Sequence, residues 1–196
     1  TRDDQGEPLR MIGVCTDITD QKFAAAAAEV AEERYRALFE NAAFGVFRTS
    51  LDGRFISANA ALARILGYGS PDELMASVGD AGQDVHIDSL RREQLIEALT
   101  EDDVVNGFET QARRRSDGVP IWVSITARAV RGGHGELVNL EGVVEDISER
   151  KAAERRLAVQ YAAARILADA PSIEAAVPGV LAAVCDELGW SAGLIW

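Results

Sequence analysis

The stretch that decides the fold is Val119-Pro-Ile-Trp-Val-Ser-Ile-Thr-Ala-Arg128. Every second residue in it is apolar, and the residues between are Pro, Trp, Ser, Thr and Arg. Because side chains alternate between the two faces of a strand, the pattern predicts a strand with one buried and one open face. We expect Trp122 on the open face, away from Val123, where it needs cover from a helix at 29–41 or from a second copy of the chain.

Other segments around this strand carry alternating or helical patterns, separated by glycine-containing turns. The glycine turns Leu51-Asp52-Gly53 and Ser116-Asp117-Gly118 each separate two strand-like runs. A two-strand run, then helices, then three strands is typical of an α+β domain with an antiparallel sheet and helices on one face. The predicted elements are, in order, a helix at 29–41, strands at 44–49 and 54–58, helices at 59–67, from Ser70 and at 87–101, and strands at 104–115, 119–131 and 136–147.

An internal repeat sets the boundaries. Residues 6–22 align without a gap on residues 135–151, and both copies contain Gly-Val followed three residues later by Asp-Ile-Thr or Asp-Ile-Ser. In both, a predicted strand runs into a predicted helix, and we expect Thr19 or Ser148 to cap that helix through its hydroxyl. The chain is therefore expected to begin inside the last hairpin of one module and to contain a complete second one.

Four segments together resemble the PAS family of sensor domains. The resemblance implies a five-stranded antiparallel sheet with helices on one face and helical linkers on both sides. It also implies that Asn59 opens the family's short helix and that Asp146, Ile147 and Ser148 pass strain into the following helix. The segments are Arg34-Tyr-Arg-Ala-Leu-Phe-Glu-Asn41, Asp52-Gly-Arg-Phe-Ile-Ser-Ala-Asn59, Arg115-Ser-Asp-Gly-Val-Pro-Ile-Trp-Val-Ser124 and Gly142-Val-Val-Glu-Asp-Ile-Ser-Glu-Arg-Lys151.

The last part of the chain resembles the start of a GAF domain, with a predicted helix followed by Gly189-Trp-Ser-Ala-Gly-Leu-Ile-Trp196. Most of the core of such a domain lies beyond it. The predicted organisation is the C-terminal hairpin of a preceding PAS domain at 1–19, a helical linker and N-terminal helix at 20–40, a PAS domain at 41–148, a helical linker at 149–170 and a truncated GAF segment at 171–196.

Between sheet and helices we expect a mostly apolar cavity. Two hypotheses stay open: the cavity holds a small apolar ligand, or its own side chains fill it. The predicted lining residues are Val46, Leu62, Leu66, Val123, Ile125, Leu140 and Val144.

No cofactor is expected. A flavin photoreceptor of this family needs a reactive cysteine, and the stretch after Leu66 has none; Val123 and Val144 stand where amides would be expected. A haem sensor needs an axial histidine on the long helix, whereas His86 precedes that helix and favours a structural or surface role. His134 lies in a predicted turn, so neither a hydrolytic triad nor a metal site can be assembled, and no catalytic residue is predicted.

Composition excludes several partners. The net charge of −12 disfavours nucleic acid and anionic membrane surfaces, and the arginine clusters at 91–92 and 113–115 are expected to be solvated. No apolar run is long enough to cross a bilayer.

Cys15 and Cys185 lack metal or redox spacing, which indicates a reducing, cytoplasmic compartment. The first residue is Thr1, so we expect a piece of a longer polypeptide.

The resemblance implies a non-catalytic sensory or relay module in a larger signalling protein, such as a sensor histidine kinase or a cyclic-dinucleotide enzyme. The alternative is a dimerisation and spacer module with no ligand. A homodimer is expected in either case, because Leu157, Tyr161 and Ala164 recur at coiled-coil spacing in the second linker.

Overall fold

The computed structural model describes residues 17–188, which belong to two separate units that divide between Glu40 and Asn41. The described part of the first unit is one helix, α1 (Thr19–Glu40), with no buried residue. An ion pair of 2.7 Å joins Glu32 to Arg36, and the rings of Tyr35 and Phe39 stack with centroids 5.9 Å apart. Both pairs are four residues apart, the spacing at which side chains meet on a helix surface.

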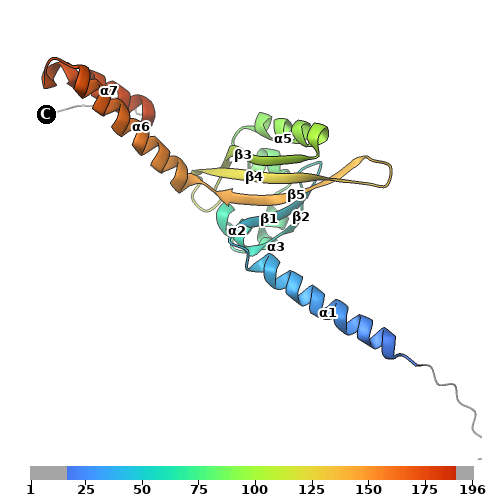
Figure 1. The fold of residues 1–196 in the computed structure, drawn as a ribbon. Helices are drawn as coiled ribbons and strands as arrows, with labels where there is room; N and C mark the ends of the chain where they lie inside the picture. Colours follow the sequence, from blue (N-terminus) through green and yellow to red (C-terminus); the bar gives the residue numbers. More distant parts are fainter. Residues whose placement is uncertain (1–16, 189–196) are drawn as a thin grey trace, which may run out of the picture. The chain divides into compact units, whose positions relative to one another are not determined.

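The second unit is built on a five-stranded antiparallel sheet with the order β2-β1-β5-β4-β3 (Figure 1). β5 therefore pairs with both β1 and β4 at the centre of the sheet. The predicted fold class is confirmed. The strands are β1 (Gly45–Ser50), β2 (Phe55–Ala58), β3 (Val104–Arg113), β4 (Pro120–Arg131) and β5 (Leu137–Asp146).

Four helices lie between β2 and β3 in the sequence, and each begins at a side chain that accepts a backbone N–H. The N-cap residues are Asn59, Ser70, Asp80 and Asp88, all of which have extended backbones. Pro71 occupies the first turn of its helix, where it loses no hydrogen bond. The helices are α2 (Ala60–Leu66), α3 (Pro71–Ser77), α4 (Ala81–Asp84) and α5 (Ser89–Asp102).

The core lies between one face of the sheet and these helices. On β4 the buried side chains are Ile121, Val123, Ile125 and Ala127, so the predicted alternation is confirmed. Val119 precedes the strand and is 45% exposed. The helices contribute Leu62, Leu66, Leu74, Leu95 and Leu99.

The opposite face of the sheet is polar. Glu141 of β5 lies between Arg48 of β1 and Arg128 of β4 and forms an ion pair with each. These bonds lower the pKa of the Glu141 carboxyl from its ordinary value, through Arg48 first and Arg128 second. Gly142, one residue later, meets a different constraint: a Cβ there would lie 2.2 Å from the carbonyl oxygen of Thr126. The glycine is required by this close approach of β4 to β5.

After the sheet the chain continues into two packed helices, α6 (Ser148–Asp169) and α7 (Ile173–Leu188). The side chain of Ile166 fits against Gly179, where an added Cβ would lie 3.2 Å from its Cγ2. Within residues 17–188 no helix has the length and apolarity needed to span a bilayer. The predicted hairpin at 1–19 lies almost entirely, and the final predicted strand at 189–196 wholly, outside the described residues.

Candidate ligand cavity and strand-to-helix junction

A cavity of about 50 Å³ lies between the sheet and the helices. Six of the seven predicted lining residues surround it: Leu62 and Leu66 from α2, Val123 and Ile125 from β4, and Leu140 and Val144 from β5. The other lining residues are Phe47, Thr49, Phe55, Ala81, Val85, His86, Arg92, Leu95, Ala112 and Ala127.

Val46 is the exception, and its placement in the cavity was wrong. Gly45, Phe47 and Thr49 are the buried residues of β1, so Val46 lies on the other face of the strand and is only half-buried. The phase of a six-residue strand that opens on glycine could not be read from its own pattern. The pairing of β1 with β5 determines which side chains of β1 face inward. Phe47 is opposite Gly142, which follows the inward residue Leu140 by two positions and so lies on the same face.

Arg92 is the main correction to the predicted site. It was expected to be solvated, but it is 8% exposed and lines the cavity. Arg92 precedes Leu95 and Leu99 by three and seven residues, so it shares their inward face of α5, and this spacing was the signal that the sequence offered. Gly82 leaves room for it, because a Cβ there would lie 2.7 Å from Arg92 Cδ.

His86 also lies against the cavity and is 8% exposed. Its backbone forms a bridge to Ala112 at the end of β3. Burial, and next the positive charge of Arg92, lower the pKa of His86 to about 4. The imidazole is therefore neutral at physiological pH. The structural role favoured from the sequence agrees with this placement.

Asn59 is fully buried and ties β1 to α2. Its Oδ1 accepts hydrogen bonds from the backbone N–H groups of Leu62 and Val46, each at 2.9 Å, and its Nδ2 donates to the carbonyl of Phe44 at 3.1 Å. One side chain thus provides a hydrogen-bond acceptor for a backbone N–H in the first turn of α2 and for one at the start of β1. Its part in signal coupling stays a prediction.

The junction between β5 and α6 differs from the expectation in one respect. Ser148 does not cap α6: the capping position is Ile147, and no side chain caps it. Instead the backbone N–H of Trp122 donates to Ser148 Oγ at 3.0 Å, and the N–H of Ser148 donates to Asp146 Oδ1 at 2.9 Å. The N–H of the buried Ile147 donates to the carbonyl of Trp122 at 2.9 Å. These bonds continue the β4–β5 ladder into the first turn of α6.

The earlier repeat has the same local geometry, since the N–H of Thr19 donates to Asp17 Oδ1 at 2.9 Å. In both copies the aspartate accepts a hydrogen bond from a backbone N–H at the start of the helix. The expectation of a hydroxyl cap failed because Ser148 has a competing partner across the sheet, which a local pattern does not reveal.

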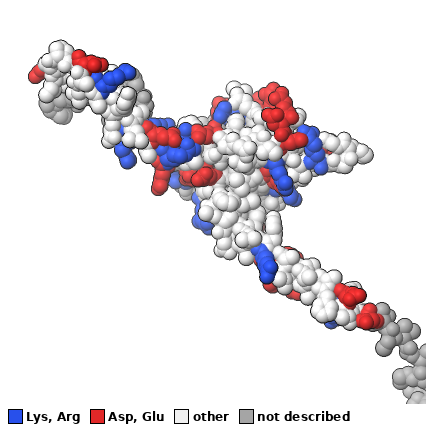
Figure 2. All heavy atoms as spheres, in the orientation of Figure 1, with Lys and Arg blue, Asp and Glu red and all other residues white. Residues whose placement is uncertain are grey.

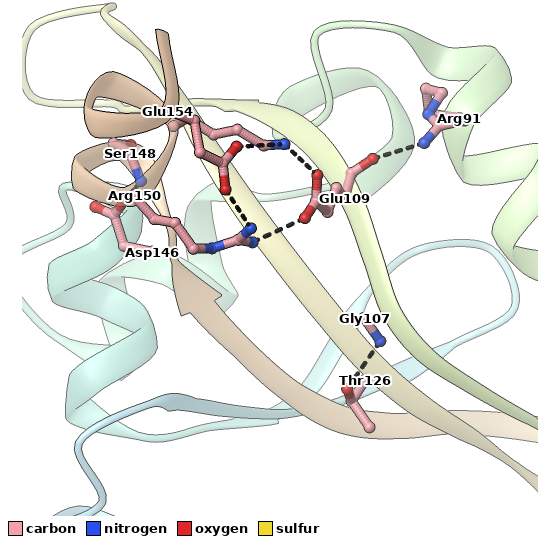
Figure 3. A network of polar contacts seen from close by, with 9 residues as sticks. Arg91, Gly107, Glu109, Thr126, Asp146, Ser148, Arg150 and Glu154 are labelled. Atoms are coloured by element: carbon pink, nitrogen blue, oxygen red, sulfur yellow. Dashed lines mark hydrogen bonds and ion pairs between the residues drawn. The ribbon is translucent and has the colours of Figure 1, made fainter. Parts of the chain in front are cut away.

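Ionic contacts connect α6 to β3 across the open face (Figure 3). Glu109 of β3 forms ion pairs with Arg150, at 2.8 Å, and with Lys151. Arg150 is also 3.0 Å from Glu154 on the next turn of α6. The hydrogen bond from Lys151, and next that from Arg150, lower the pKa of the Glu109 carboxyl. Figure 2 shows acidic and basic side chains side by side where α6 leaves the sheet.

Trp122 lies on the open face, as predicted, and the start of α6 contacts it there. The ammonium group of Lys151 is 5.4 Å from the centre of the indole ring. The first turn of α6 therefore contacts the ring from within the same chain. Cover from helix 29–41 or from a second copy stays a prediction. The contact favours the charge of Lys151 as well as shielding the ring.

Residues 33–147 match the family model described as the PAS fold. The match spans more than half of the 196 residues. The chain belongs to the PAS family. The PAS fold is a sensory, non-catalytic fold, and the match ends one residue before α6. It does not reach the tail, so the likeness of 171–196 to a GAF domain stays a prediction.

Solved PAS structures are similar to this one. A sensory box histidine kinase/response regulator from Burkholderia thailandensis is 24% identical, with 67% of this chain and 98% of that chain covered and a TM-score of 0.52. The PAS domain of an HTR-like protein from Haloarcula marismortui is 20% identical, with 64% and 99% covered and a TM-score of 0.52. At these identities the likeness establishes the fold.

Within residues 17–188 no group of three or more His, Cys, Asp or Glu side chains is placed to hold a metal ion. The side chains that line the cavity include no redox-active group.

Proposed function

We propose that this PAS module is a sensory or relay unit of a signal-transduction protein, without catalysis of its own. Its signal would leave through α6. One observation carries the proposal: Val144 lines the cavity, and the three residues Asp146, Ile147 and Ser148 bind β5 and β4 to the start of α6. A short segment therefore contacts both the cavity and the outgoing helix.

The physical basis of this relay is the stiffness of the segment. β5 is hydrogen-bonded on both sides, to β1 and to β4, so a change at Val144 cannot be absorbed by a free edge. The ion pairs of Glu109 hold the first turn of α6 against β3. A displacement of β5 relative to β3 would therefore be felt at Arg150 and Lys151. On the family resemblance, we propose a sensor histidine kinase or a cyclic-dinucleotide enzyme as the parent protein, in the cytoplasm.

Hydrogen exchange tests the relay. Val144→Ala removes two methyl groups from the cavity wall, and we expect several-fold faster amide exchange in the first turn of α6, residues 148–152. The matched control is Val138→Ala, at a position of the same strand that is 42% exposed and outside the cavity. It should leave α6 unchanged.

The junction itself is tested by repeating Val144→Ala in an Asp146→Ala/Ser148→Ala background. If the junction carries the signal, the added effect of Val144→Ala on α6 disappears, as a double-mutant comparison would measure. In the parent protein the same junction variant is expected to leave the output unresponsive to the stimulus. An unchanged α6 in Val144→Ala, or undiminished transmission through the altered junction, would favour the spacer alternative.

We also propose a second copy of the chain as the partner of α6. Leu157 and Tyr161 are 65% and 75% exposed, and Ala164 continues the spacing along the helix. Ile166 packs against α7 and projects from the opposite side of α6. It follows Leu157 by nine residues, which is about two and a half helical turns. α7 thus covers one face of α6 and leaves an apolar stripe on the other, as in a short coiled coil.

A further inference from the structure

Three polar atoms on the cavity wall have no hydrogen-bond partner within residues 17–188. They are Thr49 Oγ1 from β1, His86 Nδ1 from the loop before α5, and Arg92 Nη2 from α5. Each belongs to a residue that is at least nine-tenths buried. Buried polar groups are almost always paired, so three unpaired ones around a single cavity require an explanation.

Arg92 is the strongest of the three observations. A buried guanidinium normally has a carboxylate partner, because taking the charge out of water is costly. Among the described residues Arg92 forms no ion pair; Asp80 and Asp52 act on it only at longer range. Burial lowers the pKa of Arg92 from its ordinary value, yet an arginine stays protonated in proteins. The cavity wall therefore carries a positive charge that no carboxylate within residues 17–188 contacts as an ion pair.

We infer that the cavity binds a small organic anion, a short-chain carboxylate whose oxygens are held by Arg92. A cavity of 50 Å³ has room for about three or four non-hydrogen atoms, given that about 15 Å³ holds one water molecule. This size fits acetate, which has four non-hydrogen atoms, and is too small for an aromatic cofactor. The inference rests on the proposed sensory function, because the ligand would be the signal that the module reads.

The remaining wall suits such a ligand. Since His86 is neutral, Arg92 supplies the only full positive charge on the cavity wall, and one carboxylate neutralises it. Thr49 and His86 add two neutral groups that can donate to carboxylate oxygens. The rest of the wall is apolar and includes Leu62, Val123 and Ile125, against which a short carbon chain can pack. The occupant expected from the sequence was apolar throughout; the buried Arg92 changes its chemical class.

The first test needs no variant. Sodium formate, acetate, propionate and butyrate are titrated into the full 196-residue chain, and the side-chain Nε–Hε signal of Arg92 is followed by NMR. We expect saturable shifts for acetate. Acetamide, which has the same shape without the charge, should bind about tenfold more weakly or less, because a charge-assisted bond becomes a neutral one. Sodium chloride at equal ionic strength is the control for salt effects.

The second test uses Arg92→Met, which keeps the length of the side chain and removes the charge. The variant should lose the acetate-dependent rise in melting temperature, whereas Arg64→Met, which removes an exposed arginine on α2, should retain it. Without acetate Arg92→Met should melt at the same or a higher temperature than the wild-type chain, because an unpaired buried charge is gone.

Equal binding of acetate and acetamide, or no saturable binding of any of the four carboxylates, would overturn the inference and indicate that water alone occupies the cavity. Loss of binding in Arg64→Met to the same degree would also overturn it, since binding would then be unspecific. The proposed function is tested separately: Val144→Ala can alter α6 through the junction even if no carboxylate binds. A failed titration with a working junction would leave a relay module with a different input.

Discussion

At the residue scale, His86 links the stability of the domain to pH. Its pKa is about 4 in the folded chain, against an ordinary value of 6.5. The folded state therefore resists protonation, and the stability that the neutral imidazole contributes is complete above pH 6.5 and is lost as the pH falls toward 4. The charged groups that act on His86 are Arg92, Asp80, Arg91 and Asp88, from α5 and from the N-caps of α4 and α5.

We expect the free energy of unfolding to fall by about 1.5 kcal/mol between pH 6.5 and pH 5, as urea titrations would measure. The carboxyl groups with lowered pKa, among them Glu109 and Glu141, lose their contribution only below their ordinary values of 3.8 or 4.5, so this window isolates the histidine. His86→Gln should flatten the profile. An equal slope in that variant would show that another group titrates.

At the scale of elements, the hydroxyl of Ser148 joins α6 to β4. Ser148→Ala would leave the backbone N–H of Trp122 without its partner, and we expect a loss of about 1–2 kcal/mol in the free energy of unfolding. Ser148→Thr, which introduces the residue found at the matching position of the first repeat, keeps the hydroxyl and should retain most of the stability. Urea unfolding of both variants distinguishes a hydroxyl bond from a helix-propensity effect, which would lower both.

The same contact supports the transmission that we propose for the junction. A hydroxyl that only capped α6 would stabilise the helix and have no connection to the sheet. Because Ser148 accepts from β4 instead, and Glu109 of β3 pairs with Arg150 and Lys151, the first turn of α6 is attached to two strands. Rotation of the helix must therefore break or repartner these bonds.

At the scale of the whole molecule, the exposed stripe on α6 predicts the oligomeric state. We expect the chain to sediment as a dimer, and Leu157→Glu with Tyr161→Glu to give a monomer, because two acidic side chains would face each other across the seam. Arg155→Glu, at an exposed position on the opposite side of the same helix, makes the same total change of charge and should stay dimeric. A monomeric wild-type chain at high micromolar concentration in sedimentation equilibrium would rule out the seam.

The sequence by itself determined the α+β class, the sheet faces of β4 and β5, the helix starts at Ser70 and Asn59, and six of the seven predicted cavity residues. These features are local: alternation, capping residues and turn glycines act over a few positions. Only the tertiary structure decided the side on which Val46 lies, the partner of Ser148, the cover of Trp122 and the burial of Arg92. Each depends on a contact between segments far apart in the chain. Arg92 shows the reason most clearly. Its place on the inward face of α5 could be read from the sequence, but the gap at Gly82 that admits it to the cavity wall arises only when α4, α5 and the sheet come together.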